Sequence, residues 1–120
     1  MLISADRISA PEHVAKALLL NSGAKVIESQ RITSANELPV AFGSAYHCSE
    51  RFPDFAERRD ALGSTTETYR SYGIHDYMRK HTSIYSRTAK PDEVKTLRQH
   101  SDVPVLIVSA IDVTIDGTPI

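Results

Sequence analysis

The feature that most constrains this chain is a pair of alternating segments joined by a short turn. Residues 24–34 read AKVIESQRITS, and residues 38–47 read LPVAFGSAYH. In the first segment Val26 and Ile32 share one parity, and the other parity holds Ile27, Ser29, Arg31 and Thr33. A period of two is typical of β-strands. The two segments therefore predict a β-hairpin with Arg31 and Thr33 on one face.

The rest of the chain adds two more strands and several short helices. Residues 74–89 alternate like a long strand, and residues 103–115 form the most apolar segment. Short helices are expected in residues 9–20, 64–72 and 91–97, with a short helix or turn in residues 50–62. Helices placed between hairpin-like strands favour an α+β fold, with a mostly antiparallel sheet and short helices packed on it.

The last predicted strand is followed by a turn at Asp116 and Gly117 and then by three residues. No partner strand for it follows within these residues. We therefore expect an exposed strand edge, unless a segment beyond Ile120 covers it.

The composition is that of one globular domain. The chain has 120 residues, is 41% hydrophobic and 24% charged, and carries a formal net charge of -1. Proteins that bind DNA or membranes by electrostatics have clustered Lys and Arg and a basic pI, so neither partner is expected for these residues alone. The single cysteine, Cys48, excludes an intrachain disulfide and favours a cytoplasmic protein.

Motifs for catalysis, metal binding or nucleotide binding are absent from the sequence. The five histidines have no HxH or HExxH spacing, so no metal site is expected. There is no GxSxG, GxGxxG or GxxxxGK[ST] segment, and no cofactor is expected. His47 and Cys48 are adjacent, so their side chains would point to opposite faces of a strand.

Cations and hydroxyls on the strands remain as the candidate site. A period of two in the long strand places Tyr77, Arg79, His81, Ser83, Tyr85 and Arg87 on one face. This face is either solvent-exposed or meets the Arg31 face of the hairpin. In the second case guanidinium groups and hydroxyls would bind a phosphate, phosphonate or carboxylate. The predicted ligand-binding residues are Arg31, Thr33, Arg79, His81, Ser83 and Arg87, with Tyr46 or Tyr77 as a wall and Thr82 only if a β-bulge shifts the register.

The order of motifs resembles a known family. QRITSANELPVAF is similar to the R-x-R-x-A-[DN]-G-x-P core of the UTRA domain, the effector-binding module of GntR-family transcription regulators of the HutC subgroup. APEHVAKALLLNSGAKV resembles the opening helix and first strand of that family, and LRQHSDVPVLIVSAIDVTIDGTPI resembles its closing helix, strand and turn. RFPDF and GIHDYMRKHTSIYSRTA look most like the regulators of phosphonate uptake and metabolism.

The resemblance implies a chorismate-lyase-like fold, a homodimer and a small anionic effector. Arg31 matches the first arginine of the R-x-R motif, which holds phosphate in relatives that bind phosphorylated amino sugars. Thr33 occupies the second arginine position, and Gly43 stands where those sugar binders carry a glutamate. A smaller phosphonate or phosphate therefore fits better than an amino sugar.

In that family DNA is bound by an N-terminal winged-helix domain, which these 120 residues lack, as they lack the usual final strand. The leading hypothesis is thus a ligand-sensing domain of a transcription regulator. Two alternatives remain open on the sequence: a chorismate-lyase-like enzyme, and a dimerisation module that binds no ligand.

Overall fold

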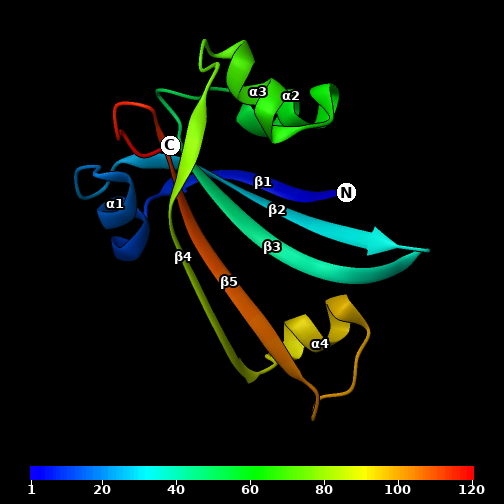
Figure 1. The fold of residues 1–120 in the computed structure, drawn as a ribbon. Helices are drawn as coiled ribbons and strands as arrows, with labels where there is room; N and C mark the ends of the chain where they lie inside the picture. The colour runs from blue at the N-terminus through cyan, green and yellow to red at the C-terminus, as the bar shows by residue number, and fades with distance from the viewer.

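The computed structural model describes residues 1–120, which form five strands and four short helices (Figure 1). The strands are β1 (Leu2–Ser9), β2 (Lys25–Ala35), β3 (Leu38–Cys48), β4 (Tyr77–Thr88) and β5 (Pro104–Thr114). The helices are α1 (Glu12–Leu18), α2 (Phe55–Leu62), α3 (Thr65–Ser71) and α4 (Pro91–Leu97). The predicted α+β class is confirmed.

Two antiparallel sheets make up the strand layer. One sheet has the order β1-β2-β3, and the other consists of β4 and β5. The predicted β2–β3 hairpin is present, and its turn residues Asn36 and Glu37 both have positive φ. Two-residue hairpin loops favour such left-handed residues because their twist matches that of the strands.

The strand β1 was not predicted. It pairs antiparallel with β2 along its whole length, from Leu2 opposite Arg31 to Ser9 opposite Lys25. Both Leu2 and Ile8 in this edge strand are only half-buried, and Ile3 is exposed. Its hydrophobic alternation is therefore weak, and it is the pairing with β2 that defines the strand.

The helices lie on different parts of the sheets. Helices α2 and α3 pack together, and their residues Phe55 and Tyr69 form a buried core with Phe52 and the C-terminal Ile120. Ser64 caps α3 by accepting a hydrogen bond from the Glu67 amide at 3.1 Å, as expected for a hydroxyl before a helix. Helix α1 buries Val14 and Ala15, and α4 lies against β3.

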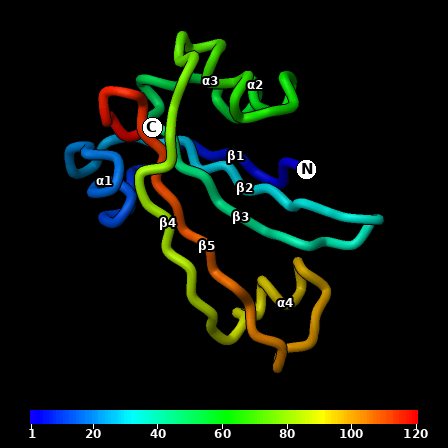
Figure 2. The backbone as a smooth tube through the Cα atoms, in the orientation of Figure 1, coloured from blue at the N-terminus to red at the C-terminus, as the bar shows by residue number.

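The strands β3 and β5 are the facing edges of the two sheets. They run in the same direction, close together near the C-terminus, and diverge toward α4 (Figure 2). No β-ladder joins them. Residues 118–120 turn back along β5, where Pro119 pairs with Val113 and the Ile120 amide donates to the Asp112 carbonyl at 2.9 Å. Since β4 pairs with the other edge of β5, this short return lies on the edge that faces β3.

Candidate functional site

A groove with a volume of about 1050 Å³ separates β3 from β5. Residues 40–47 of β3 and residues 104–112 of β5 all line it, together with residues from β2 and from all four helices. No residue of β4 lines it. A pocket beside Arg31, which the ligand-binding hypothesis requires, is therefore present.

One wall of the groove is the sheet face that carries Arg31. In the β2–β3 ladder Arg31 lies opposite Gly43, and Thr33 lies opposite Ala41. Directly paired residues project to the same face, so small β3 side chains stand beside the longer β2 ones. The face turns toward α2, since Arg31 Nη2 lies 3.4 Å from the Asp60 carboxylate. The predicted shared face of Arg31 and Thr33 is confirmed.

Positive charge dominates the α2 side of the groove. Arg59 of α2 lines it and donates from Nε to the neutral Thr65 hydroxyl at 3.2 Å. The acids that line the groove are already paired: Asp112 with Arg79 at 2.7 Å and Glu93 with Arg87 at 2.7 Å. Two guanidinium groups thus face the groove, and only the exposed Asp60 competes for one of them.

His47 forms the inner end of the same face. It is 5% exposed, stacks on Phe55 with ring centroids 3.6 Å apart, and its Nε2 lies 2.8 Å from the Tyr69 hydroxyl. Burial lowers the pKa of His47 to about 4, so the ring is neutral at pH 7. Burial also raises the pKa of Tyr69, whose hydroxyl therefore stays protonated.

A β-bulge in β4 changes which of its residues share a face. Arg79 pairs with Asp112 and His81 pairs with Ile111, so Lys80 is the extra residue. An extra residue reverses the alternation beyond it. Arg79 consequently shares its face with Thr82, toward which its Nη1 points at 3.5 Å. The expectation that one face carries Arg79, His81, Ser83 and Arg87 together is wrong.

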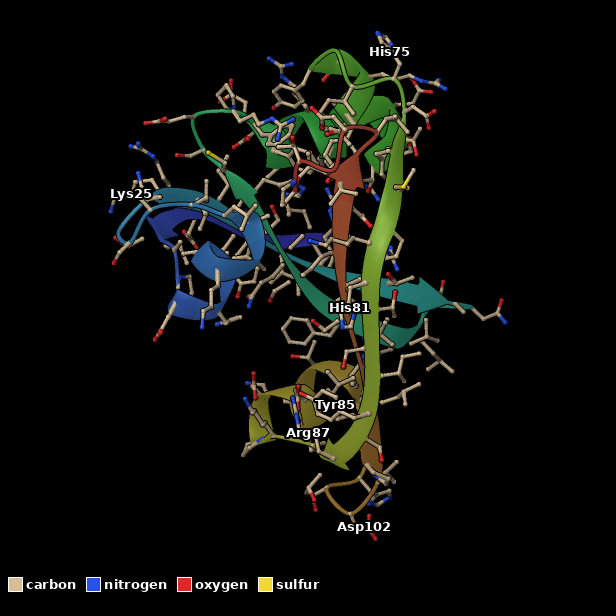
Figure 3. The ribbon with its side chains drawn as sticks, turned by 60° about the vertical axis from the view of Figure 1, so that its left-hand side comes forward. Lys25, His75, His81, Tyr85, Arg87 and Asp102 are labelled. Atoms are coloured by element: carbon tan, nitrogen blue, oxygen red, sulfur yellow. The ribbon has the colours of Figure 1, made fainter.

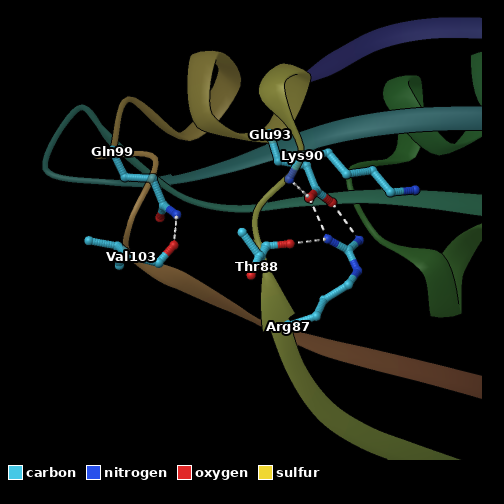
Figure 4. Close-up of polar contacts among 6 residues, drawn as sticks. All are labelled: Arg87, Thr88, Lys90, Glu93, Gln99 and Val103. Carbon is cyan, nitrogen blue, oxygen red and sulfur yellow. Dashed lines mark hydrogen bonds and ion pairs between the residues drawn. The ribbon is translucent and has the colours of Figure 1, made fainter.

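His81, Ser83 and Arg87 follow the bulge and lie on the side of the β4–β5 ribbon opposite to Arg79. Arg87 projects to α4, where it makes two hydrogen bonds to Glu93, at 2.7 and 2.9 Å (Figure 3, Figure 4). His81 and Ser83 share the Arg87 parity, and none of the three lines the groove. The hydrogen bond from Arg87, together with one from the Lys90 amide, lowers the pKa of Glu93 to about 2.

The two predicted wall residues lie apart. Tyr46 lines the groove but pairs with Glu28, on the sheet face opposite to Arg31, with its ring edge-on to His13. Tyr77 does not line the groove; it packs on Tyr69 with ring centroids 4.9 Å apart and shares a hydrogen bond with Thr66. The ligand-binding role of all the predicted residues stays a prediction.

The groove residues that were not predicted as site residues include Ser29, His47, Arg59 and Thr65. The alternation of β2 already placed Ser29 on the Arg31 face, so a signal for it existed. Arg59 and Thr65 lie on or beside short helices whose docking is tertiary, and no local pattern indicates it. No three His, Cys, Asp or Glu side chains lie together as metal ligands would, and no helix is long and apolar enough to cross a membrane.

The chain is an α+β domain with an open groove between its two sheets. Comparison with family models identifies the family: residues 1–120 match the UTRA domain. The chain belongs to the UTRA family, and the family resemblance of the sequence is confirmed.

Similar proteins agree with this assignment. An uncharacterized HTH-type transcriptional regulator from Rhizobium meliloti is 28% identical over 119 residues, which are 99% of this chain and 49% of that protein. The chain thus spans about half the length of that relative. PhnF from Mycobacterium smegmatis has a TM-score of 0.89 at 22% identity, covering 100% of this chain and 53% of its own.

A GntR-family transcriptional regulator from Enterococcus faecalis V583 has a TM-score of 0.84 at 15% identity, covering 99% of this chain and 85% of its own. These structural neighbours establish the chorismate-lyase-like fold. Regulators, not enzymes, form this group, which agrees with the expectation that the chain is not an enzyme.

Proposed function

We propose that this chain is the effector-binding and dimerisation domain of a bacterial GntR-family regulator of the HutC subgroup, and that it senses a small anion in the groove beside Arg31. The observation that carries the proposal is the charge balance of the groove. Its acids are neutralised by arginines of β4, while Arg31 and Arg59 face the space between the sheets. Charge-assisted hydrogen bonds from guanidinium groups suit phosphate, phosphonate and carboxylate groups.

A phosphonate or phosphate ester fits this groove better than a phosphorylated amino sugar. Gly43, which lies opposite Arg31, has no carboxylate that could bind the amino group of such a sugar. The resemblance of residues 51–55 and 73–89 to regulators of phosphonate metabolism supports the same class of ligand.

The mechanism is a population shift between two dimer geometries. An effector that binds one geometry more tightly favours it, and the spacing of the DNA-binding domains changes accordingly. DNA contact is assigned to an N-terminal winged-helix domain outside these residues, in a cytoplasmic protein. On the face of the β4–β5 ribbon opposite to Arg87, the residues Ile84, Leu106 and Val108 are all more than half exposed, and this apolar surface is suited to a second copy.

Anion titration tests the proposal. Methylphosphonate, inorganic phosphate and acetate are titrated into the domain and followed by calorimetry. Arg31→Ala is expected to weaken binding of the best ligand about tenfold or more, because a charged hydrogen bond contributes roughly 1.5–3 kcal/mol. Arg70→Ala is the matched control: it removes the same charge from an exposed position on α3 outside the groove. Equal effects of the two variants, or no binding at all, would contradict the proposal.

A further inference from the structure

Two buried polar side-chain atoms have no hydrogen-bond partner, and both belong to residues that line the groove. They are the Ser29 hydroxyl and Nδ1 of His47. Each residue is only 5% exposed. A buried polar atom without a partner costs roughly 1–3 kcal/mol, so such atoms often mark a place that a ligand or water completes.

Both residues lie on the same face as Arg31. Ser29 is two positions before Arg31 on β2, which places their Cα atoms about 7 Å apart along the strand. Ser29 pairs with Ala45, and His47 is the next residue of β3 on that face. Because Gly43 and Ala45 have little or no side chain, this face is hollowed between the guanidinium end and the His47 end.

The His47 end of this face is uncharged. His47 is held by Phe55 and Tyr69, and the ring carries no charge at pH 7. The acids that line the groove, Asp112 and Glu93, are committed to arginines. An ammonium group buried there would have no counter-ion, which is unfavourable. A hydroxyl group can donate or accept, so it matches either tautomer of the imidazole.

We propose that Ser29 and His47 form an uncharged subsite of the groove, which binds a hydroxyl of the effector while Arg31 binds its anionic group. The inference rests on the proposed function and narrows the ligand to a short hydroxylated phosphate or phosphonate. In this proposal Ser29 and His47 determine the specificity for the part of the ligand that carries the hydroxyl.

Two matched ligands test the subsite. Glycerol 3-phosphate carries a phosphate monoester and two hydroxyls, and n-propyl phosphate carries the same phosphate with none. Calorimetric titration of the domain should show about fivefold or tighter binding of glycerol 3-phosphate, as expected for one to two additional hydrogen bonds. Ser29→Ala should remove most of that preference and leave the affinity for n-propyl phosphate unchanged.

The control variant is Ser44→Ala. Ser44 also lines the groove, but it pairs with Gln30 on the opposite sheet face. It should leave the preference intact. Ser29→Ala should also keep or raise the melting temperature, because it removes a buried hydroxyl that has no partner.

The outcomes separate the two proposals. If n-propyl phosphate binds in an Arg31-dependent manner and glycerol 3-phosphate binds no better, the subsite is refuted and the anion site stands. Retention of the preference in Ser29→Ala likewise refutes the subsite. Failure of both ligands to bind overturns the anion site, and the subsite with it.

Discussion

Arg31 and Gly43 lie directly opposite each other in the β2–β3 ladder, on the face that turns toward α2. A Cβ added at Gly43 would meet no atom within 4 Å, so the space beside the guanidinium is open. A ligand can therefore approach the Arg31 guanidinium through the open space beside Gly43.

A glutamate at position 43 should weaken the binding of a simple anion that has no amino group. Gly43→Glu places a carboxylate across from Arg31, and directly opposed residues of opposite charge attract each other. We expect anion affinity to fall about tenfold or more. Gly43→Ala is the control, because the added methyl group meets nothing; it should change affinity by less than about twofold. Titration with methylphosphonate measures both, and a strong loss in Gly43→Ala would contradict the open space.

Removing the competing acid should have the opposite effect. Asp60 is 61% exposed and lies 3.4 Å from Arg31, whose side chain is 23% exposed. An exposed ion pair of this kind contributes roughly 0.2–1 kcal/mol. Asp60→Asn should therefore tighten anion binding by about two- to fivefold at low salt and by less at high salt. Glu57→Gln changes the same charge on the same helix without contacting Arg31, and it should not reproduce the effect.

The stability of the domain should decrease as the pH falls from about 6.5 to about 4. The pKa of His47 is near its ordinary value of 6.5 in the unfolded chain and about 4 in the fold. In that window the unfolded chain binds a proton that the folded chain does not, so protonation favours unfolding by roughly 3 kcal/mol in total. Urea denaturation at a series of pH values measures the slope.

Two variants identify the group responsible for this pH dependence. His47→Phe keeps a ring for the stack on Phe55 and should flatten the profile between pH 6.5 and 4. His81→Gln changes an exposed histidine and should leave the slope unchanged. An unchanged slope in His47→Phe would assign the effect to other groups.

Local alternation allowed much of the fold to be predicted, and its interruptions explain the errors. The β2–β3 hairpin and the shared face of Arg31 and Thr33 follow from a period of two that no bulge disturbs before Thr33. In β4 the same reasoning failed, because the bulge at Lys80 places His81, Ser83 and Arg87 on the α4 side, opposite to Arg79. A single inserted residue leaves no composition signal, and only the partner strand reveals it.

The site was harder to predict than the fold for a related reason. Arg31 could be found from its strand position, but its neighbours in space come from α2 and from the far end of β3. The burial of His47 depends on Phe55 and Tyr69, whose packing is non-local. In the sequence, His47 was only one of five histidines with no metal-ligand spacing between them.

The free edge of β5 gives the last prediction. The Thr114 amide donates to the Thr118 carbonyl at 2.9 Å, and the Asp112 carbonyl accepts from Ile120, so both residues direct their backbone groups to the groove. Backbone groups of a strand alternate between its two sides. The amides of the remaining residues of this parity within β5 should therefore face the groove without a partner strand: Leu106, Val108 and Ala110.

Amide hydrogen exchange followed by NMR checks this directly. Leu106, Val108 and Ala110 should exchange about tenfold or more faster than Ile107 and Ser109, whose amides face β4. A dilution series distinguishes a free edge from one that a second copy covers, because protection by a partner falls with concentration. Protection of all five amides at every concentration would show that the groove between β3 and β5 is closed in solution, and the space proposed for the effector would then not exist.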